Sequence, residues 1–127
     1  MADVLADTSA WIAALRGADR ATKETVDRLL DEDRLVFCGV VEMELLHGIR
    51  PAERRRLLPL FAALPYVEAD RADWQAAGEL LGDLRAKGVT IPATDALVAA
   101  LCRRHGFRLL SLDRHFDAVP LLHRLPR

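Results

Sequence analysis

Apolar residues recur every three or four positions along most of the chain, and short apolar runs rich in leucine, β-branched or aromatic side chains separate these stretches. The first pattern predicts amphipathic helices, and the second predicts buried strands. We expect helices over residues 9–17, 21–33, 40–49, 51–64, 70–88 and 93–106. We expect strands over residues 3–6, 34–39, 66–68, 107–112 and 120–125.

The alternation of strands with helices favours an α/β fold with a mainly parallel sheet. Ligands of such sheets bind beyond the carboxyl ends of the strands. Asp7 directly follows the first expected strand and Asp113 follows the strand over 107–112, while Asp95 lies in the first turn of the last expected helix. These three carboxylates are therefore expected at one end of the sheet.

Individual residues predict the ends and the inner faces of the helices. Thr94 is a candidate N-cap, and Pro59 is expected to kink or split the helix over 51–64 because proline has no N–H to donate. Trp11 and Trp74 stand at core-like positions of their helices, so we expect both to pack inside and not to stack on nucleic-acid bases.

Composition limits the classes of protein to which the chain can belong. The 127 residues fit one domain over 1–127, and an apolar fraction of 51% with a mean hydropathy of +0.06 is typical of a folded globular protein. The 18 basic and 19 acidic residues give a net charge of -1, which argues against nucleic-acid binding by bulk charge. The apolar stretches are too short to cross a bilayer and the N-terminus is acidic, so we expect a cytoplasmic location without membrane contact.

Each candidate acid also has a purely structural interpretation. Asp7 and Asp95 are favourable at helix N-termini and Asp113 is favourable in a turn. Glu44 lies among apolar residues of its helix and needs a solvated face or a partner. Carboxylates gathered in one place repel one another, and a divalent cation stabilises such a group. An all-oxygen ligand set suits Mg²⁺ or Mn²⁺ more than zinc, and such an ion is equipped for phosphoryl chemistry.

Other catalytic arrangements find little support in the sequence. The chain has no glycine-rich nucleotide-binding loop, and Ser9 is not part of a G-x-S-x-G elbow. None of the four histidines is paired with another at i,i+4, and only His115 is close to a candidate acid. Cys38 and Cys102 belong to no C-x-x-C motif and are expected to be buried thiols. A metal-dependent acid cluster is therefore the favoured chemistry.

Four segments carry a resemblance to a known family. They are DTSAWI at 7–12, ELLHG at 44–48, TDALVAALCRRHG at 94–106 and LLSLDRHF at 109–116. In order and spacing they resemble the PIN-domain nucleases, and within that group the VapC-type toxins of bacterial type II toxin–antitoxin pairs. The resemblance covers essentially the whole chain and implies a PIN-like three-layer α/β/α sandwich around a central, mainly parallel sheet.

The resemblance implies a Mg²⁺-dependent endoribonuclease that hydrolyses RNA phosphodiester bonds with a metal-activated water, with Mn²⁺ as the alternative ion. Asp7, Glu44, Asp95 and Asp113 match the four acids of the family in that order, and Ser111 replaces the usual threonine of the last motif. Asp7, Asp95 and Asp113 would hold the ion. Glu44 would orient or deprotonate the nucleophilic water.

Several further residues are expected to support this site. Ser9 belongs to the first motif, and Asp117 lies one helical turn beyond Asp113 as a supporting or surface group. Four arginines near the motifs are candidates for RNA contacts, because the guanidinium fork matches phosphate geometry. They are Arg103, Arg104, Arg108 and Arg114.

The resemblance also implies partners, namely RNA as substrate, a cognate VapB-like antitoxin, and a second copy of the chain in a homodimer. The alternative is a non-catalytic PIN-like scaffold that binds RNA or protein without cleaving RNA. Because all four acids are present, the enzyme is favoured over the scaffold.

Overall fold

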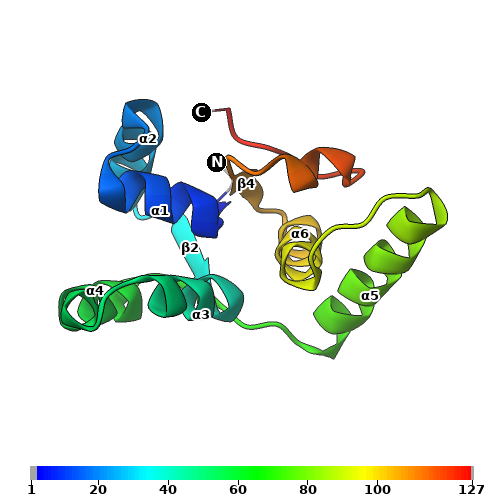
Figure 1. The fold of residues 1–127 in the computed structure, drawn as a ribbon, viewed down its shortest axis with the longest axis horizontal. Coiled ribbons are helices and arrows are strands. Elements are labelled where there is room, and N and C mark those ends of the chain that lie inside the picture. The colour runs from blue at the N-terminus through cyan, green and yellow to red at the C-terminus, as the bar shows by residue number, and fades with distance from the viewer. Residues whose placement is uncertain (1–2, 127) are drawn as a thin grey trace.

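A four-stranded parallel sheet forms the centre of the fold, with helices around it (Figure 1). The structure is a computed structural model and describes residues 3–126. Its strands are β1 (Val4–Ala6), β2 (Leu35–Cys38), β3 (Tyr66–Val67) and β4 (Arg108–Leu110). Its helices are α1 (Thr8–Arg16), α2 (Arg20–Asp31), α3 (Gly39–Gly48), α4 (Pro51–Ala63), α5 (Arg71–Ala86), α6 (Ala93–His105) and the 3₁₀ helix η1 (Arg114–Ala118).

Helices cover both faces of the sheet, which confirms the expected α/β/α arrangement. α1 packs against α2, and α5 packs against α6. Figure 1 shows these two pairs on opposite sides of the strands. Every residue of β1 and β2 is buried, as is typical of parallel strands covered on both faces. Within the described part of the chain, no helix has the length and apolar character needed to span a membrane.

The order of the strands is β3-β2-β1-β4, and every neighbouring pair is parallel. β2 and β3 are added on one side of β1, whereas β4 lies on its other side. The order therefore reverses between β1 and β4, and ligands of open α/β sheets bind at such a switch point. Ala6 pairs with Leu110, so Asp7 and Ser111 leave the sheet next to each other.

An aromatic cluster joins α1, β2 and α4. Trp11, Phe37 and Phe61 are each at most 2% exposed, which confirms the expected burial of Trp11. The Trp11 ring meets the two phenylalanine rings edge-on at centroid distances of 5.7 and 6.0 Å, and Phe37 and Phe61 stack at 4.8 Å. Such aromatic pairs contribute about 0.5–1.5 kcal/mol beyond the burial of their area. The cluster fixes α1, and with it Asp7, relative to the sheet.

Trp74, in contrast, lies on the outside of α5 with 60% of its surface exposed, so its expected inward position is wrong. The buried face of α5 consists of Asp73, Ala77, Leu80 and Leu84. Asp73 tolerates burial because the Arg104 side chain of α6 donates to it at 2.7 Å and the Asp70 backbone N–H donates at 3.0 Å. The periodicity of apolar residues cannot reveal a buried carboxylate, and the prediction therefore placed Trp74 inside where Asp73 is buried.

Two helix details differ from expectation. Pro59 lies inside α4, and the helix continues over Pro51–Ala63 without splitting. The carbonyl of Arg55 loses its intrahelical partner at this position, but both residues are exposed and water can replace the bond. At α6 the N-cap is Pro92, so Thr94 lies within the first turn and does not cap the helix.

The segment 120–125 is not a strand, which corrects the last expected element. Among its described residues Arg124 alone forms a bridge, to Leu109 of β4. Leu121 has a φ of 60°, in the left-handed region, and this conformation interrupts an extended chain. The segment therefore pairs with β4 at this one bridge only.

We expect Asp73→Asn to destabilise the fold by about 1–2 kcal/mol at pH 7. Burial alone would raise the pKa of Asp73, but hydrogen bonds from the Asp70 backbone and from Arg104 and His105 outweigh burial and hold this pKa below its ordinary value. The charged carboxylate therefore stabilises the fold above the unfolded-state pKa, and this stabilisation is lost as the pH falls through the lowered folded-state pKa. Urea unfolding at neutral and strongly acidic pH measures the effect.

The difference between wild type and Asp73→Asn should be present at neutral pH and shrink in acid. Asp83→Asn, an exposed exchange on the same helix, serves as the control and should unfold like the wild type at both pH values. A difference of equal size at both pH values would show that the charge of Asp73 is not the cause.

Candidate active site

Asp7 is the carboxylate at the switch point between β1 and β4. It is the N-cap of α1 and only 6% exposed. Its Oδ1 accepts hydrogen bonds from the Ser9 hydroxyl at 2.7 Å and from the Ala10 N–H at 3.1 Å, and its Oδ2 accepts one from the Ser111 hydroxyl at 2.6 Å. The capping interpretation of Asp7 is therefore right, and the same carboxylate also contacts the end of β4.

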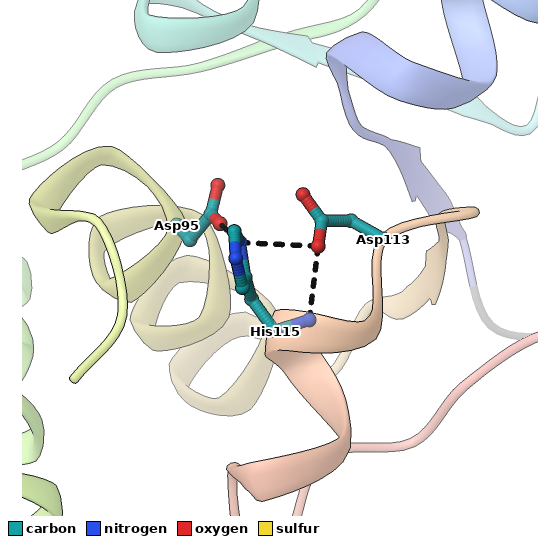
Figure 2. A group of neighbouring side chains, drawn as sticks. All are labelled: Asp95, Asp113 and His115. Atoms are coloured by element: carbon teal, nitrogen blue, oxygen red, sulfur yellow. Dashed lines mark hydrogen bonds and ion pairs between the residues drawn. The ribbon is translucent and has the colours of Figure 1, made fainter. Parts of the chain in front are cut away.

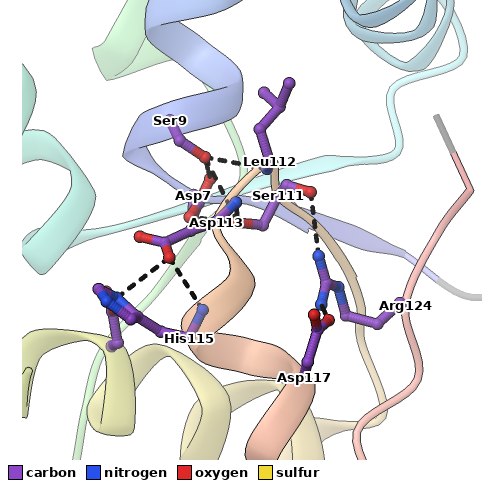
Figure 3. Close-up of polar contacts among 9 residues, drawn as sticks. Asp7, Ser9, Ser111, Leu112, Asp113, His115, Asp117 and Arg124 are labelled. Atoms are coloured by element: carbon purple, nitrogen blue, oxygen red, sulfur yellow. Dashed lines mark hydrogen bonds and ion pairs between the residues drawn. The ribbon is translucent and has the colours of Figure 1, made fainter. Parts of the chain in front are cut away.

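Two serines tie the turn after β4 to Asp7 (Figure 3). Ser111 is buried, and its hydroxyl donates to Asp7 and accepts from the Asp113 N–H at 2.9 Å. The Ser9 hydroxyl accepts from the Leu112 N–H at 3.0 Å and lies 3.3 Å from the Ser111 hydroxyl. These bonds fix the distance between the start of α1 and the turn that carries Asp113.

Asp95, Asp113 and His115 form a compact group (Figure 2). Asp95 is half-buried in the first turn of α6, and Asp113 is the N-cap of η1, where it accepts from the His115 N–H at 2.9 Å. The Nδ1 atom of His115 lies 2.8 Å from Asp95 Oδ2 and 3.0 Å from Asp113 Oδ1. One imidazole therefore joins carboxylates from two separate elements.

Burial and the repulsion of neighbouring carboxylates raise the pKa of Asp7 and of Asp95. Burial is the largest cause for Asp7, and the charge of Asp113 adds to it against the hydrogen bonds from the serines and the α1 backbone. Burial likewise raises the pKa of Asp95, with a contribution from the charge of Asp113 and against the hydrogen bond to the imidazole. The hydrogen bond to Asp95 raises the pKa of His115, which favours its charged form. This histidine neutralises the acidic group only in part.

Glu44 lies on α3, outside the group of Figure 2. It is half-buried, and the Thr8 hydroxyl donates to its Oε1 at 2.6 Å. This bond gives Glu44 the partner that its apolar surroundings require. Because Thr8 directly follows Asp7, the structure links Glu44 to Asp7 through the start of α1.

Asp117, an expected supporting residue, contacts Arg124. It is exposed, and its Oδ1 accepts a hydrogen bond from Arg124 at 2.8 Å. Ser9 and Ser111, the other two supporting residues, both contact Asp7.

The structure places the four candidate RNA-contact arginines at two ends of the molecule. Arg103 and Arg104 lie in the last turn of α6, about 12 Å along the helix axis from Asp95 in its first turn. Arg108 begins β4 at its amino end, away from the switch point. Of the four, Arg114 alone is next to one of the candidate site acids, Asp113, and it is exposed at the start of η1. Proximity to a motif in sequence did not reveal which end of an element an arginine occupies.

Two contacts of the acids were not predicted. His115 stands two residues after Asp113, and a histidine that close to a candidate ligand was a usable signal. Its contact with Asp95 spans 20 residues of sequence, and the contact between Thr8 and Glu44 spans 36. No local pattern indicates either of these pairings.

The donor atoms of the group suit a hard divalent cation. Asp95, Asp113 and His115 each bring a potential ligand atom within 4.8 Å of the others, and the imidazole could bind an ion only after losing its proton. Carboxylate oxygens are the ligands that Mg²⁺ and Mn²⁺ prefer. A cation would also relieve the repulsion that contributes to the raised pKa of Asp7 and Asp95. The residues present therefore fit such an ion.

Comparisons with known proteins agree with this arrangement. The PIN domain family matches residues 4–122. Ribonuclease VapC11 of Mycobacterium tuberculosis is 35% identical over 121 residues, which are 91% of this chain and 90% of that protein. The structure of VapBC2 from Rickettsia felis bound to a promoter DNA fragment is similar with a TM-score of 0.81, at 19% identity over 96% of both chains. A toxin–antitoxin complex from Klebsiella pneumoniae is similar with a TM-score of 0.75, at 16% identity over 93% of both chains.

Proposed function

The chain belongs to the PIN domain family and to its VapC type, and from this premise we propose that it is a metal-dependent endoribonuclease that serves as the toxin of a toxin–antitoxin pair. A relative that is 35% identical carries the name ribonuclease, which supports RNA as the substrate. The proposed cofactor is Mg²⁺ or Mn²⁺.

The convergence of Asp7, Asp95 and Asp113 carries this proposal. The three residues follow β1, open α6 and follow β4, and the charges of Asp7 and Asp113 both act on Asp95, which supports a common site. Repelling carboxylates that are withdrawn from water destabilise a fold, and such groups therefore indicate a functional site.

We assign the binding of the ion to the carboxylates of Asp7, Asp95 and Asp113. A bound Mg²⁺ or Mn²⁺ stabilises negative charge on the phosphate and lowers the pKa of a coordinated water. The hydroxyls of Ser9 and Ser111 hold the two oxygens of Asp7, so this carboxylate is oriented in advance.

Glu44 is assigned to the attacking water. Thr8 holds its Oε1, which orients the carboxylate, and its Oε2 would accept the proton that the water loses. Arg114, exposed beside Asp113, is assigned to a phosphate of the substrate.

An antitoxin and a second copy of the chain are the proposed protein partners. Proteins of the same fold carry the names VapBC2 and toxin–antitoxin complex, which supports the antitoxin. A protein that cleaves the RNA of its own cell requires such a partner to be tolerated.

Induction of the wild-type chain in a bacterial host should arrest growth, and induction of Asp95→Asn should not. The purified wild type should cleave RNA in Mg²⁺ or Mn²⁺ at least about 100-fold faster than Asp95→Asn, because the variant lacks one of the charges that hold the ion. Growth curves and gel assays of RNA fragments measure the two results.

Asp83→Asn is the matched control, since it makes the same exchange at an exposed position of α5 and should behave like the wild type. Cleavage that persists in Asp95→Asn after contaminating nucleases have been excluded would contradict the assigned site. RNA binding without cleavage across several divalent ions would favour the non-catalytic scaffold.

A further inference from the structure

We propose that Arg124 is a positioning residue of the candidate active site, which holds the segment 111–117 and thereby sets the place of Asp113 for RNA cleavage. This segment, here called the acid-bearing segment, comprises the turn after β4 and most of η1. The inference rests on the proposed function and extends it to a residue outside the four motifs.

The backbone around Arg124 is anchored to β4. Leu109 donates its N–H to the carbonyl of His123 at 2.8 Å, and its own carbonyl accepts from the Leu125 N–H at 2.8 Å. These two bonds place Arg124 in a parallel bridge with Leu109. The side chain of Arg124 therefore starts from a fixed position beside the strand that leads to the acids.

The guanidinium of Arg124 binds the acid-bearing segment before and after Asp113 (Figure 3). Its Nη2 donates to the Ser111 carbonyl at 3.1 Å, and its Nη1 donates to Asp117 Oδ1 at 2.8 Å. The group also lies over the ring of Phe116, 5.9 Å from the centroid. One side chain thus spans the segment on both sides of the acid.

Ser111 connects this guanidinium to the acids. Its carbonyl accepts from Arg124, while its hydroxyl donates to Asp7 at 2.6 Å and accepts from the Asp113 N–H at 2.9 Å. A displacement of Ser111 would therefore move both of its carboxylate-bearing neighbours. A misplacement of about 1 Å can lower a catalysed rate by about 10²-fold.

Arg124 holds the acid-bearing segment more through the geometry of its hydrogen bonds than through its charge. The side chains of Arg124 and Asp117 are 31% and 68% exposed, and an ion pair this open adds little to stability. The planar fork of arginine presents donors in two directions at once, whereas lysine offers a single compact charge on a flexible stem. Arg124→Lys should therefore retain only part of the effect.

The test compares the kinetics of Arg124→Gln and Arg124→Lys with those of a control, Arg34→Gln. Arg34 forms an ion pair with Glu32 at 3.0 Å just before β2, at the amino end of the sheet and away from the acids. The kcat of Arg124→Gln should fall about tenfold or more, with KM changed less than about twofold. The kcat of Arg124→Lys should lie between that of Arg124→Gln and that of the wild type. Arg34→Gln should keep the wild-type kcat.

Two readouts do not depend on cleavage. Amide hydrogen exchange in the acid-bearing segment should become faster in Arg124→Gln and remain unchanged in Arg34→Gln. The affinity for Mn²⁺, measured by electron paramagnetic resonance, should fall about tenfold in Arg124→Gln alone. A general loss of stability would not produce this selective pattern.

Failure of the inference and failure of the proposed function are distinguishable. The role of Arg124 would be overturned if the wild type cleaves RNA and Arg124→Gln matches the control in kcat, amide exchange and Mn²⁺ affinity. Wild type that cleaves no RNA would overturn the proposed function, while exchange and Mn²⁺ affinity would still decide on Arg124. If Arg124→Gln does not fold, Arg124→Lys and Asp117→Asn replace it, and wild-type values in both would overturn the inference.

Discussion

Asp7→Asn should lose RNA cleavage by at least about 100-fold and nevertheless unfold at a higher temperature than the wild type. Activity is lost because asparagine keeps the shape of the side chain but not the charge that attracts a divalent ion. The hydrogen bonds from Ser9 and Ser111 can persist in a rotated arrangement, because hydroxyls both donate and accept. Cleavage assays and thermal unfolding of the same preparations measure the two effects together.

The gain in stability follows from the raised pKa of Asp7, of which burial is the largest cause. An acid whose pKa is higher in the folded state destabilises the fold once it is charged, so stability falls as the pH rises from the unfolded-state value of 3.8 through the raised folded-state value. At neutral pH the neutral amide avoids this loss. We expect a rise in Tm of roughly 2–4 °C, which corresponds to about 1 kcal/mol and shrinks in acid.

Asp83→Asn provides the comparison for both effects, because it removes one charge from an exposed position of α5. It should retain the activity of the wild type and its Tm. A fall in the Tm of Asp7→Asn would mean that the charge of Asp7 stabilises α1, as its N-cap, by more than the burial of this charge destabilises the fold. Retained cleavage in Asp7→Asn would remove this residue from the site.

Removal of divalent ions should abolish cleavage, and their addition should stabilise the fold. EDTA is expected to stop the reaction completely, and excess Mg²⁺ or Mn²⁺ should restore it. A ligand at 100 times its Kd stabilises the folded state by about 2.7 kcal/mol, which corresponds to a rise in Tm of roughly 8 °C for a domain of this size. Thermal unfolding across a titration of each ion measures the shift.

Variants of the site residues distinguish an ion bound at the site from a general effect of divalent ions on stability. Asp95→Asn and Asp113→Asn should lose most of the rise in Tm, whereas Asp83→Asn should show all of it. Cleavage that continues in EDTA, or a rise in Tm that is equal in all of these variants, would contradict an ion held by the aspartates.

The convergence of Asp7 and Asp113 could be predicted because it depends on local order. Asp7 directly follows β1 and Asp113 comes shortly after β4, and parallel strands end at the same edge of a sheet. The structural interpretations are also right, since Asp7 caps α1 and Asp113 lies in the turn after β4, where it also caps η1. Capping and clustering were treated as alternatives, but a carboxylate has two oxygens and can do both.

Contacts between distant elements could not be predicted in this way. The bond between Thr8 and Glu44 depends on how α3 packs beside α1, and the bond between Arg124 and Ser111 depends on where the last segment returns. Burial of Asp73 depends on a partner from α6 that local periodicity does not contain. In each case the hydrogen-bond partner of a polar group comes from a distant part of the chain, and the residues next to that group in the sequence do not indicate it.

The switch point between β1 and β4 also has a consequence for the order of events during synthesis. Asp7 leaves the ribosome early, but its neighbour Ser111 follows 104 residues later. At a translation rate of about 5–20 residues per second, this interval lasts several seconds. The nascent protein cannot assemble these acids until β4 has emerged and docked beside β1.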